Sequence, residues 1–122
     1  MNKTSELGFV AEGYVAQYLK ARGYEILNHN YRKPWGEIDI VAEKDGILIF
    51  VEVKASSVKV AGFEAELRAD KEKMKKVIRT ARTYLLDKKY APAQEWQLDI
   101  ISITFDKDRG VAKIKHFKNV EV

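Results

Sequence analysis

The chain has 122 residues, a length that fits a single domain (residues 1–122) with its own hydrophobic core. It contains no cysteine, which excludes disulfides, thiolate-bound zinc and thiol nucleophiles and fits a cytoplasmic protein. Its net charge of +4 and its pI of about 9.2 favour an anionic partner, of which nucleic acid is the obvious candidate. No apolar run reaches the roughly 20 residues of a membrane span, and the N-terminus lacks the pattern of a signal peptide.

Hydrophobic periodicity predicts two helices and five strands. Residues 4–22 carry apolar side chains at helical spacing and are followed by Gly23, where a helix stops. Residues 70–89 carry a second apolar stripe, and residues 58–69 form a connector without a predicted structure. The predicted strands cover residues 24–32, 36–43, 47–55, 96–105 and 111–117, the first of them as an edge strand. The order αβββαββ predicts an α/β domain with a mixed sheet and a central β-hairpin flanked by helices.

The second and third strands are predicted to form this hairpin, because Asp45-Gly46 between two apolar runs suits a two-residue turn with positive φ. In that register Asp39 lies opposite Glu52, and Glu37 lies opposite Lys54 on the same face. One face carries Glu37, Asp39, Val41, Phe50, Glu52 and Lys54, and the other carries Ile38, Ile40, Ala42, Ile49, Val51 and Val53. The second, wholly apolar face is expected to be the core.

The polar face of the hairpin needs an explanation, because opposed carboxylates beside an apolar run repel each other and resist ionisation. A divalent cation between Asp39 and Glu52 would remove both penalties, and Mg²⁺ or Mn²⁺ accepts one or two carboxylates together with water and phosphate. Lys54 could orient the attacking water or stabilise charge on the phosphate. The pattern predicts a site for phosphodiester hydrolysis; the alternative is a surface hairpin whose charged side chains are simply solvated.

The chain resembles the PD-(D/E)XK nuclease superfamily in two segments, Gly36-Glu37-Ile38-Asp39 and Phe50-Val51-Glu52-Val53-Lys54. Further matches narrow the resemblance to the YraN-like family of small endonucleases, which is related in fold to archaeal Holliday-junction resolvases. These matches are Ala11-Glu12, Tyr18-Leu19, Gly23-Tyr24-Glu25-Ile26-Leu27 and Asn30-Tyr31-Arg32. The similarity is dense over residues 7–54 and continues in register through Leu98-Asp99-Ile100-Ile101.

The resemblance implies a restriction-endonuclease-like fold and a Mg²⁺- or Mn²⁺-dependent endonuclease that acts on DNA, including structured or branched DNA. Asp39 and Glu52 would be metal ligands, with the carbonyl of Val53 as a third. Lys54 would be the catalytic lysine. Glu12 would be an accessory acid that reaches the metal site from the first helix, and a solvated helix glutamate is an equal alternative.

The chain departs from the family pattern at three places. Ala11 stands where the family usually has glycine, and Ala55-Ser56-Ser57 and Gln97 stand where relatives carry arginine. The missing arginines leave the substrate open and favour an alternative function, a non-catalytic DNA-binding module that retains the nuclease fold. A third, weaker alternative is a subunit that self-associates through its sheet edge. Resolvase-like cleavage of two strands would call for a homodimer.

Several other side chains have two interpretations each. The basic residues of the second predicted helix either follow a phosphate backbone or form a solvated surface. They are Lys71, Lys73, Lys75, Lys76, Arg79, Arg82, Lys88 and Lys89. Lys71 stands at the approximate place of a helix-start lysine in relatives, and Glu37 is expected to support the site. Trp35 either stacks on a base or packs over the hairpin mouth, and Asp99 is either a buried network partner near the site or solvated at an edge.

Overall fold

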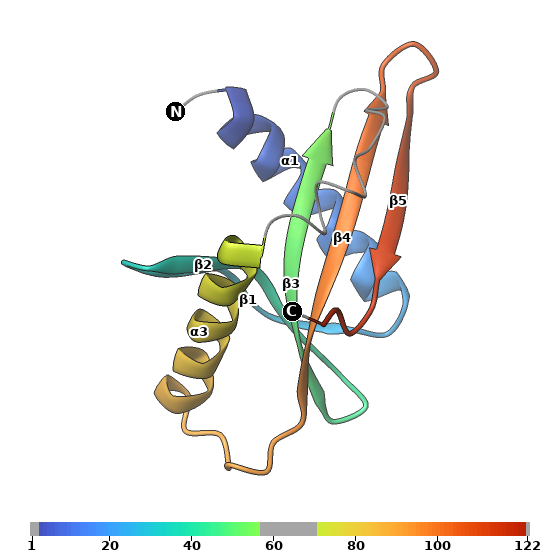
Figure 1. Ribbon diagram of the computed structural model, residues 1–122. Helices are drawn as coiled ribbons and strands as arrows, with labels where there is room; N and C mark the ends of the chain where they lie inside the picture. The colour runs from blue at the N-terminus through green and yellow to red at the C-terminus, as the bar shows by residue number, and fades with distance from the viewer. Residues whose placement is uncertain (1–2, 57–70, 122) are drawn as a thin grey trace.

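The computed structural model describes residues 3–56 and 71–121 (Figure 1), with side chains from Leu7 onward in the first helix. The connector predicted over residues 58–69 and the predicted helix start at Asp70 lie outside the described residues. The helices and strands are α1 (Lys3–Ala21), β1 (Glu25–Lys33), β2 (Gly36–Lys44), β3 (Ile47–Ser56), α3 (Lys71–Asp87), β4 (Trp96–Asp106) and β5 (Val111–Phe117). The chain is therefore a mixed α/β fold.

The five strands form one mixed sheet in the order β1-β2-β3-β4-β5. Neighbouring strands are antiparallel except for β3 and β4, which run parallel. A parallel pair needs a crossover, and α3 lies within the crossover from β3 to β4. The prediction of β1 as an edge strand is confirmed.

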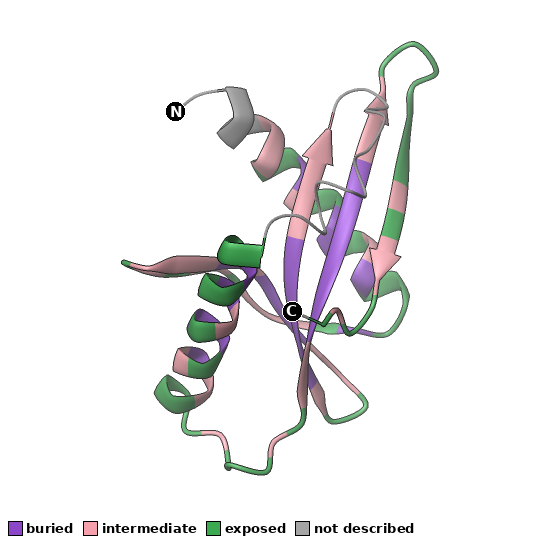
Figure 2. Cartoon of the chain, in the orientation of Figure 1, coloured by how far each residue is buried: buried purple, intermediate pink, exposed green. Residues whose placement is uncertain are grey.

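The helices α1 and α3 cover opposite faces of the sheet, so β3 and β4 are buried on both sides along much of their length (Figure 2). The prediction of one apolar and one polar hairpin face is wrong, because Val41 and Phe50 of the expected polar face are fully buried beneath α3. Ile38 lies with them, whereas Ile40 lies in the cluster beneath α1. No helix within the described residues combines the length and apolar character that a bilayer span requires.

The turn between β2 and β3 has the predicted two-residue form. Asp45 and Gly46 have φ of 53° and 79°, the positive values that such a turn demands. The predicted register is confirmed from the pair beside the turn as far as Ile40 opposite Val51. Turn chemistry therefore sets the alignment of the two central antiparallel strands.

The backbone ladder between β2 and β3 ends at that pair, and the rest of β2 pairs only with β1 as far as Gly36. Asp39 is therefore not a ladder partner of Glu52, nor is Glu37 a ladder partner of Lys54, as an unbroken hairpin would require. Strand twist accumulates along a hairpin, and here β2 turns away with β1. The backbone N–H of Val53 on β3 is therefore available to a side chain of β2.

Gly36, at the start of β2, lies against α3. A Cβ atom at this position would stand 2.6 Å from Thr80 Oγ1 and 3.1 Å from the carbonyl oxygen of Lys76. The Thr80 hydroxyl is itself held by donating to that carbonyl at 2.7 Å. The glycine thus permits a close approach that seats α3 on the sheet next to the end of the β2–β3 ladder.

Candidate active site

Asp39 lies on β2 one residue beyond the last ladder pair. Its Oδ2 accepts a hydrogen bond of 2.8 Å from the backbone N–H of Val53. Burial, together with the negative charges of Glu52, Glu12 and Glu37, raises the pKa of Asp39 to about 8 against the opposing effect of the Val53 amide. These carboxylates are therefore close enough to make ionisation of Asp39 unfavourable.

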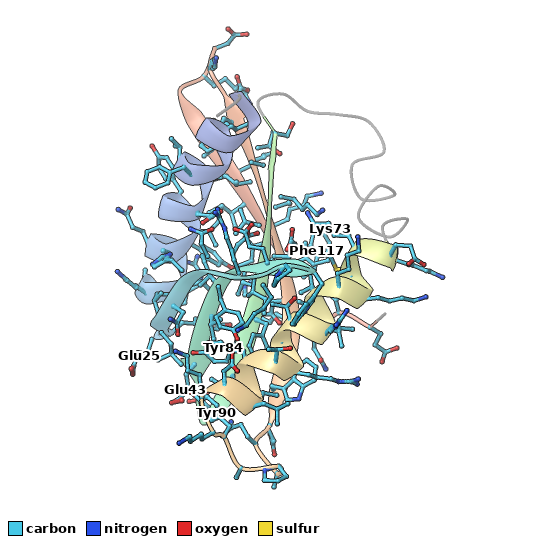
Figure 3. The ribbon with its side chains drawn as sticks, turned by 90° about the vertical axis from the view of Figure 1, so that its left-hand side faces the viewer. Glu25, Glu43, Lys73, Tyr84, Tyr90 and Phe117 are labelled. Atoms are coloured by element: carbon cyan, nitrogen blue, oxygen red, sulfur yellow. The ribbon has the colours of Figure 1, made fainter. Side chains whose placement is uncertain are left out.

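Glu52 points from β3 toward the N-terminal end of α3, and only 4% of its side chain is exposed. Its Oε1 lies 2.7 Å from Nζ of Lys73, which Figure 3 shows at that end of α3. Burial opposes the positive charge of Lys73, but Glu52 and the hydrogen bonds around the ammonium outweigh burial and raise its pKa. A buried carboxylate of the site is thus neutralised by a lysine from a distant part of the chain.

The resemblance places the helix-start lysine approximately at Lys71, but the lysine that contacts Glu52 is Lys73, two residues later. A pattern in the sequence could have identified Lys73, because it lies one turn before Val77 on the same side of α3. The buried stripe continues from there through Ala81 and Tyr84. A lysine that extends a buried stripe by one turn is expected to face the sheet rather than solvent.

Glu12 approaches this site from α1, where it is partly buried. Burial raises its pKa, a hydrogen bond from Asn30 lowers it, and the charges of Glu37 and Glu52 raise it. Asn30 has a φ of 51°, a conformation that asparagine tolerates better than most residues. The structure therefore brings Glu12 into electrostatic contact with the hairpin carboxylates rather than leaving it fully solvated.

Glu37 and Lys54 flank the site on two different strands. Glu37 forms an ion pair of 3.4 Å with Arg32, its ladder partner on β1. Lys54 is partly buried on β3, and its side chain interacts with that of Lys73. Two lysines and the carboxylate of Glu52 therefore share one end of β3.

The donor set suits a hard divalent cation that completes its coordination with substrate. Within residues 3–56 and 71–121, no three acidic or histidine side chains converge closely enough to hold a metal ion together. The ligand set of Asp39, Glu52, Glu12 and Val53 accordingly stays a prediction. Mg²⁺ commonly uses only one or two carboxylates plus water and phosphate. A cation would offset both the burial and the repulsion that raise the pKa of Asp39.

Of the two interpretations of Asp99, the structure supports a buried network partner, but the side chains of this network are not those of the candidate site. It is fully buried, and its Oδ1 accepts hydrogen bonds of 2.9 Å from Gln97 Nε2 and from the backbone N–H of Asn119. Its Oδ2 lies 2.6 Å from His116 Nε2, whose Nδ1 is 3.1 Å from the Tyr18 hydroxyl. Burial raises the pKa of Asp99, but these hydrogen bonds outweigh it and lower the pKa overall. The network fastens β5 and the C-terminal segment to β4 and α1.

Trp35, in the turn between β1 and β2, packs against α3. The guanidinium carbon of Arg79 lies 4.2 Å from the centre of its ring. The indole N–H is buried and has no hydrogen-bond partner among the residues that the structure describes. Of the two predicted roles, the structure supports packing, with Arg79 rather than the hairpin mouth as the contact.

The chain is similar in sequence to a family of bacterial proteins. The profile of the uncharacterised protein family UPF0102 matches residues 11–103. A UPF0102 protein of Campylobacter fetus is 40% identical over 107 residues, which cover 88% of this chain and 91% of that protein. A UPF0102 protein of Fervidobacterium nodosum is 38% identical over 115 residues, which cover 91% of this chain and 78% of that protein.

Proposed function

Because the chain belongs to the uncharacterised protein family UPF0102, whose description assigns no activity, we propose its function from the site itself. The protein is a Mg²⁺- or Mn²⁺-dependent endonuclease with a PD-(D/E)XK-type, restriction-endonuclease-like fold, and it hydrolyses DNA phosphodiesters. One observation carries the proposal. Asp39, with a raised pKa, lies beside the buried carboxylate of Glu52, and two lysines stand at the same end of β3. Carboxylates for a cation and ammonium groups for a phosphate are the components that this hydrolysis requires.

Each residue has a separate role in this proposal. Asp39 and Glu52 would hold the cation, whose Lewis acidity would activate water and offset the charge of the scissile phosphate. Lys54 would orient the attacking water, and Lys73 would contact a phosphate oxygen. Glu12, from α1, would complete the acidic wall of the site. Cleavage of both strands of a branched DNA would need two copies of the chain.

A cleavage panel tests the proposal. Linear, nicked, flapped and four-way DNA are incubated with Mg²⁺ or Mn²⁺ and either the unmodified protein or Asp39→Asn. The substitution keeps an oxygen that can accept the Val53 hydrogen bond but removes the charge that would bind metal. We expect a rate loss of roughly 100-fold or more, as for a removed catalytic electrostatic group. The exposed Asp108→Asn is the matched control and should cut normally. Equal cleavage by the two variants, or none by the unmodified protein on any substrate, would refute the proposed activity.

One structural feature favours a second candidate, a non-catalytic DNA-binding module on the same fold. Asp39 already accepts the Val53 N–H, and Glu52 already pairs with Lys73. These contacts occupy both carboxylates without a metal ion. This candidate predicts salt-sensitive DNA binding that is unchanged in Asp39→Asn and no metal-dependent cleavage.

A further inference from the structure

The helix α3 carries a groove of about 440 Å³ whose lining residues lie outside its buried stripe. Figure 2 shows that α3 has exposed residues along its length on the side away from the sheet. We call this groove the basic groove, and its lining residues are Lys75, Ile78, Arg79, Arg82, Thr83 and Leu86. Three of the six are cationic, and Leu86 is 79% exposed. A surface on which three cationic side chains gather suits an anionic polymer.

The positive charge of the basic groove is largely uncompensated. Within the described part of the chain, neither Arg79 nor Arg82 forms an ion pair with a carboxylate. Lys75 lies 3.5 Å from Glu72, but both side chains are mostly exposed and such a pair contributes little. Asp87, at the other end of α3, is turned toward β1, where it pairs with Lys33 at 2.9 Å. The acidic residues of α3 therefore do not neutralise the groove.

The turn between β1 and β2 holds one of these cations in place. Trp35 lies beneath the guanidinium of Arg79, with the guanidinium carbon 4.2 Å from the ring centre. The close contact of Gly36 with α3 fixes the turn that presents this ring. An arginine stacked on an aromatic ring keeps its donors free and loses less side-chain entropy when it binds a phosphate. Arg79 is thus prepared for binding before any ligand arrives.

The spacing of the cations matches a nucleic-acid strand. Lys75, Arg79 and Arg82 follow at i, i+4 and i+7, so they span about 10 Å along α3 at the helical rise of 1.5 Å per residue. Measured along the axis of a DNA duplex, each strand carries one phosphate about every 3.4 Å, so this distance covers about three phosphate steps of one strand. Lys73, at the beginning of the same helix, already contacts Glu52 of the candidate active site. A strand lying along the groove would therefore lead toward that site.

We propose that the basic groove binds the phosphate backbone of duplex DNA and thereby directs it to the carboxylates of Asp39 and Glu52. The ligand class rests on the proposed function, while the groove itself stands on its own residues and contacts. Binding is to phosphate and carries no base-sequence preference. The proposal adds a substrate-contact surface that lies outside the reacting groups.

The test measures binding of a short fluorescently labelled DNA duplex by anisotropy, in chelator, so that cleavage does not contribute. Salt is varied between about 50 and 200 mM. The test variant is Arg79→Gln with Arg82→Gln, and the matched control is Lys107→Gln with Arg109→Gln in the exposed turn after β4, which removes the same charge. Each lost phosphate contact should reduce the slope of log K against log salt by about 0.9, so the test pair should lose about 1.8. The single variant Arg82→Gln should lose about 0.9 without touching the stack on Trp35.

The outcomes separate the groove from the nuclease. An equal loss of slope in the test and control pairs would mean that net charge alone drives binding, and it would overturn the proposal. So would an unmodified protein that binds no duplex at the lowest salt. Cleavage in Mn²⁺ is scored separately on the same proteins. If the protein binds DNA through the groove but cuts no substrate, the groove proposal stands and only the proposed nuclease activity is refuted.

Discussion

Replacing Asp39 by asparagine should stabilise the protein in the absence of metal. The aspartate is buried near three other carboxylates, and its pKa is raised from 3.8 to about 8. Asparagine is nearly the same size and can still accept the hydrogen bond from Val53. The variant therefore removes a group that must take up a proton on folding while it keeps the contact, which is why a polar substitution at a buried position is expected to increase stability.

The size of the effect follows from the raised pKa of Asp39. One pKa unit corresponds to about 1.4 kcal/mol of preference between the two protonation states. In the unfolded chain the pKa of Asp39 is 3.8, about three units below neutral pH. Protonating Asp39 on folding at pH 7 therefore costs on the order of 4 kcal/mol of folding free energy. A typical domain has only about 5 to 15 kcal/mol of stability, so a change of this size is easily measured.

The pH dependence has a defined sign. The folded pKa of Asp39 lies above the unfolded one, so between about pH 4 and 8 the folded state holds a proton that the unfolded chain releases. The free energy of unfolding should therefore fall as the pH rises through this window. Asp39→Asn should show little of this decline. In the unmodified protein, Mn²⁺ at a hundredfold excess over its Kd should raise the free energy of unfolding by about 2.7 kcal/mol and so offset this decline.

Urea unfolding at several pH values, with and without Mn²⁺, measures all of these quantities on one set of samples. The exposed Asp108→Asn serves as control and should change the free energy of unfolding by less than about 0.5 kcal/mol. Two results would contradict this prediction: a lower stability of Asp39→Asn at pH 7, or the same stability of the unmodified protein at pH 5 and pH 8. Either result would mean that the carboxylate of Asp39 is not held among like charges.

Three further changes test other contacts. Lys73→Met should cost about 1–2 kcal/mol in urea unfolding and slow any cleavage, because it strips a buried carboxylate of its partner, whereas Lys71→Met should do neither. Gly36→Ala should lower the free energy of unfolding by about 1–3 kcal/mol, because the added Cβ forces β2 away from α3. Gly13→Ala is the control: its Cβ would meet open space, so the helix-favouring alanine should raise the free energy of unfolding by about 0.5–1 kcal/mol. Asp99→Asn should cost about 2–3 kcal/mol at pH 7. Because the pKa of Asp99 is lowered on folding, this loss should shrink below about pH 4, where the unmodified protein also loses the contribution.

The sequence alone determined the elements and the central turn. Helical and strand periods depend on residues a few positions apart, so they can be recognised without knowing the rest of the fold. Asp45-Gly46 set a two-residue turn, and that turn fixed the pairing as far as Ile40 and Val51. The same arithmetic placed Asp39 near Glu52, and the structure has them close enough to interact.

The tertiary structure decided which side chains complete the site. The end of the β2–β3 ladder let Asp39 bind the amide of Val53, and the seating of α3 brought Lys73, not Lys71, onto Glu52. The apolar stripe indicates which side of α3 faces the sheet, but where α3 lies on the sheet depends on its close contact with Gly36, which is distant in the sequence.

The network around Asp99 shows the same division. The sequence placed this aspartate in an apolar strand but left open whether it was buried or solvated. Its partners His116 and Asn119 lie 17 and 20 residues away, and they reach it only because β5 returns antiparallel beside β4. Contacts within an element follow from periodicity, whereas contacts between elements depend on how strands pair and helices pack once the chain has folded.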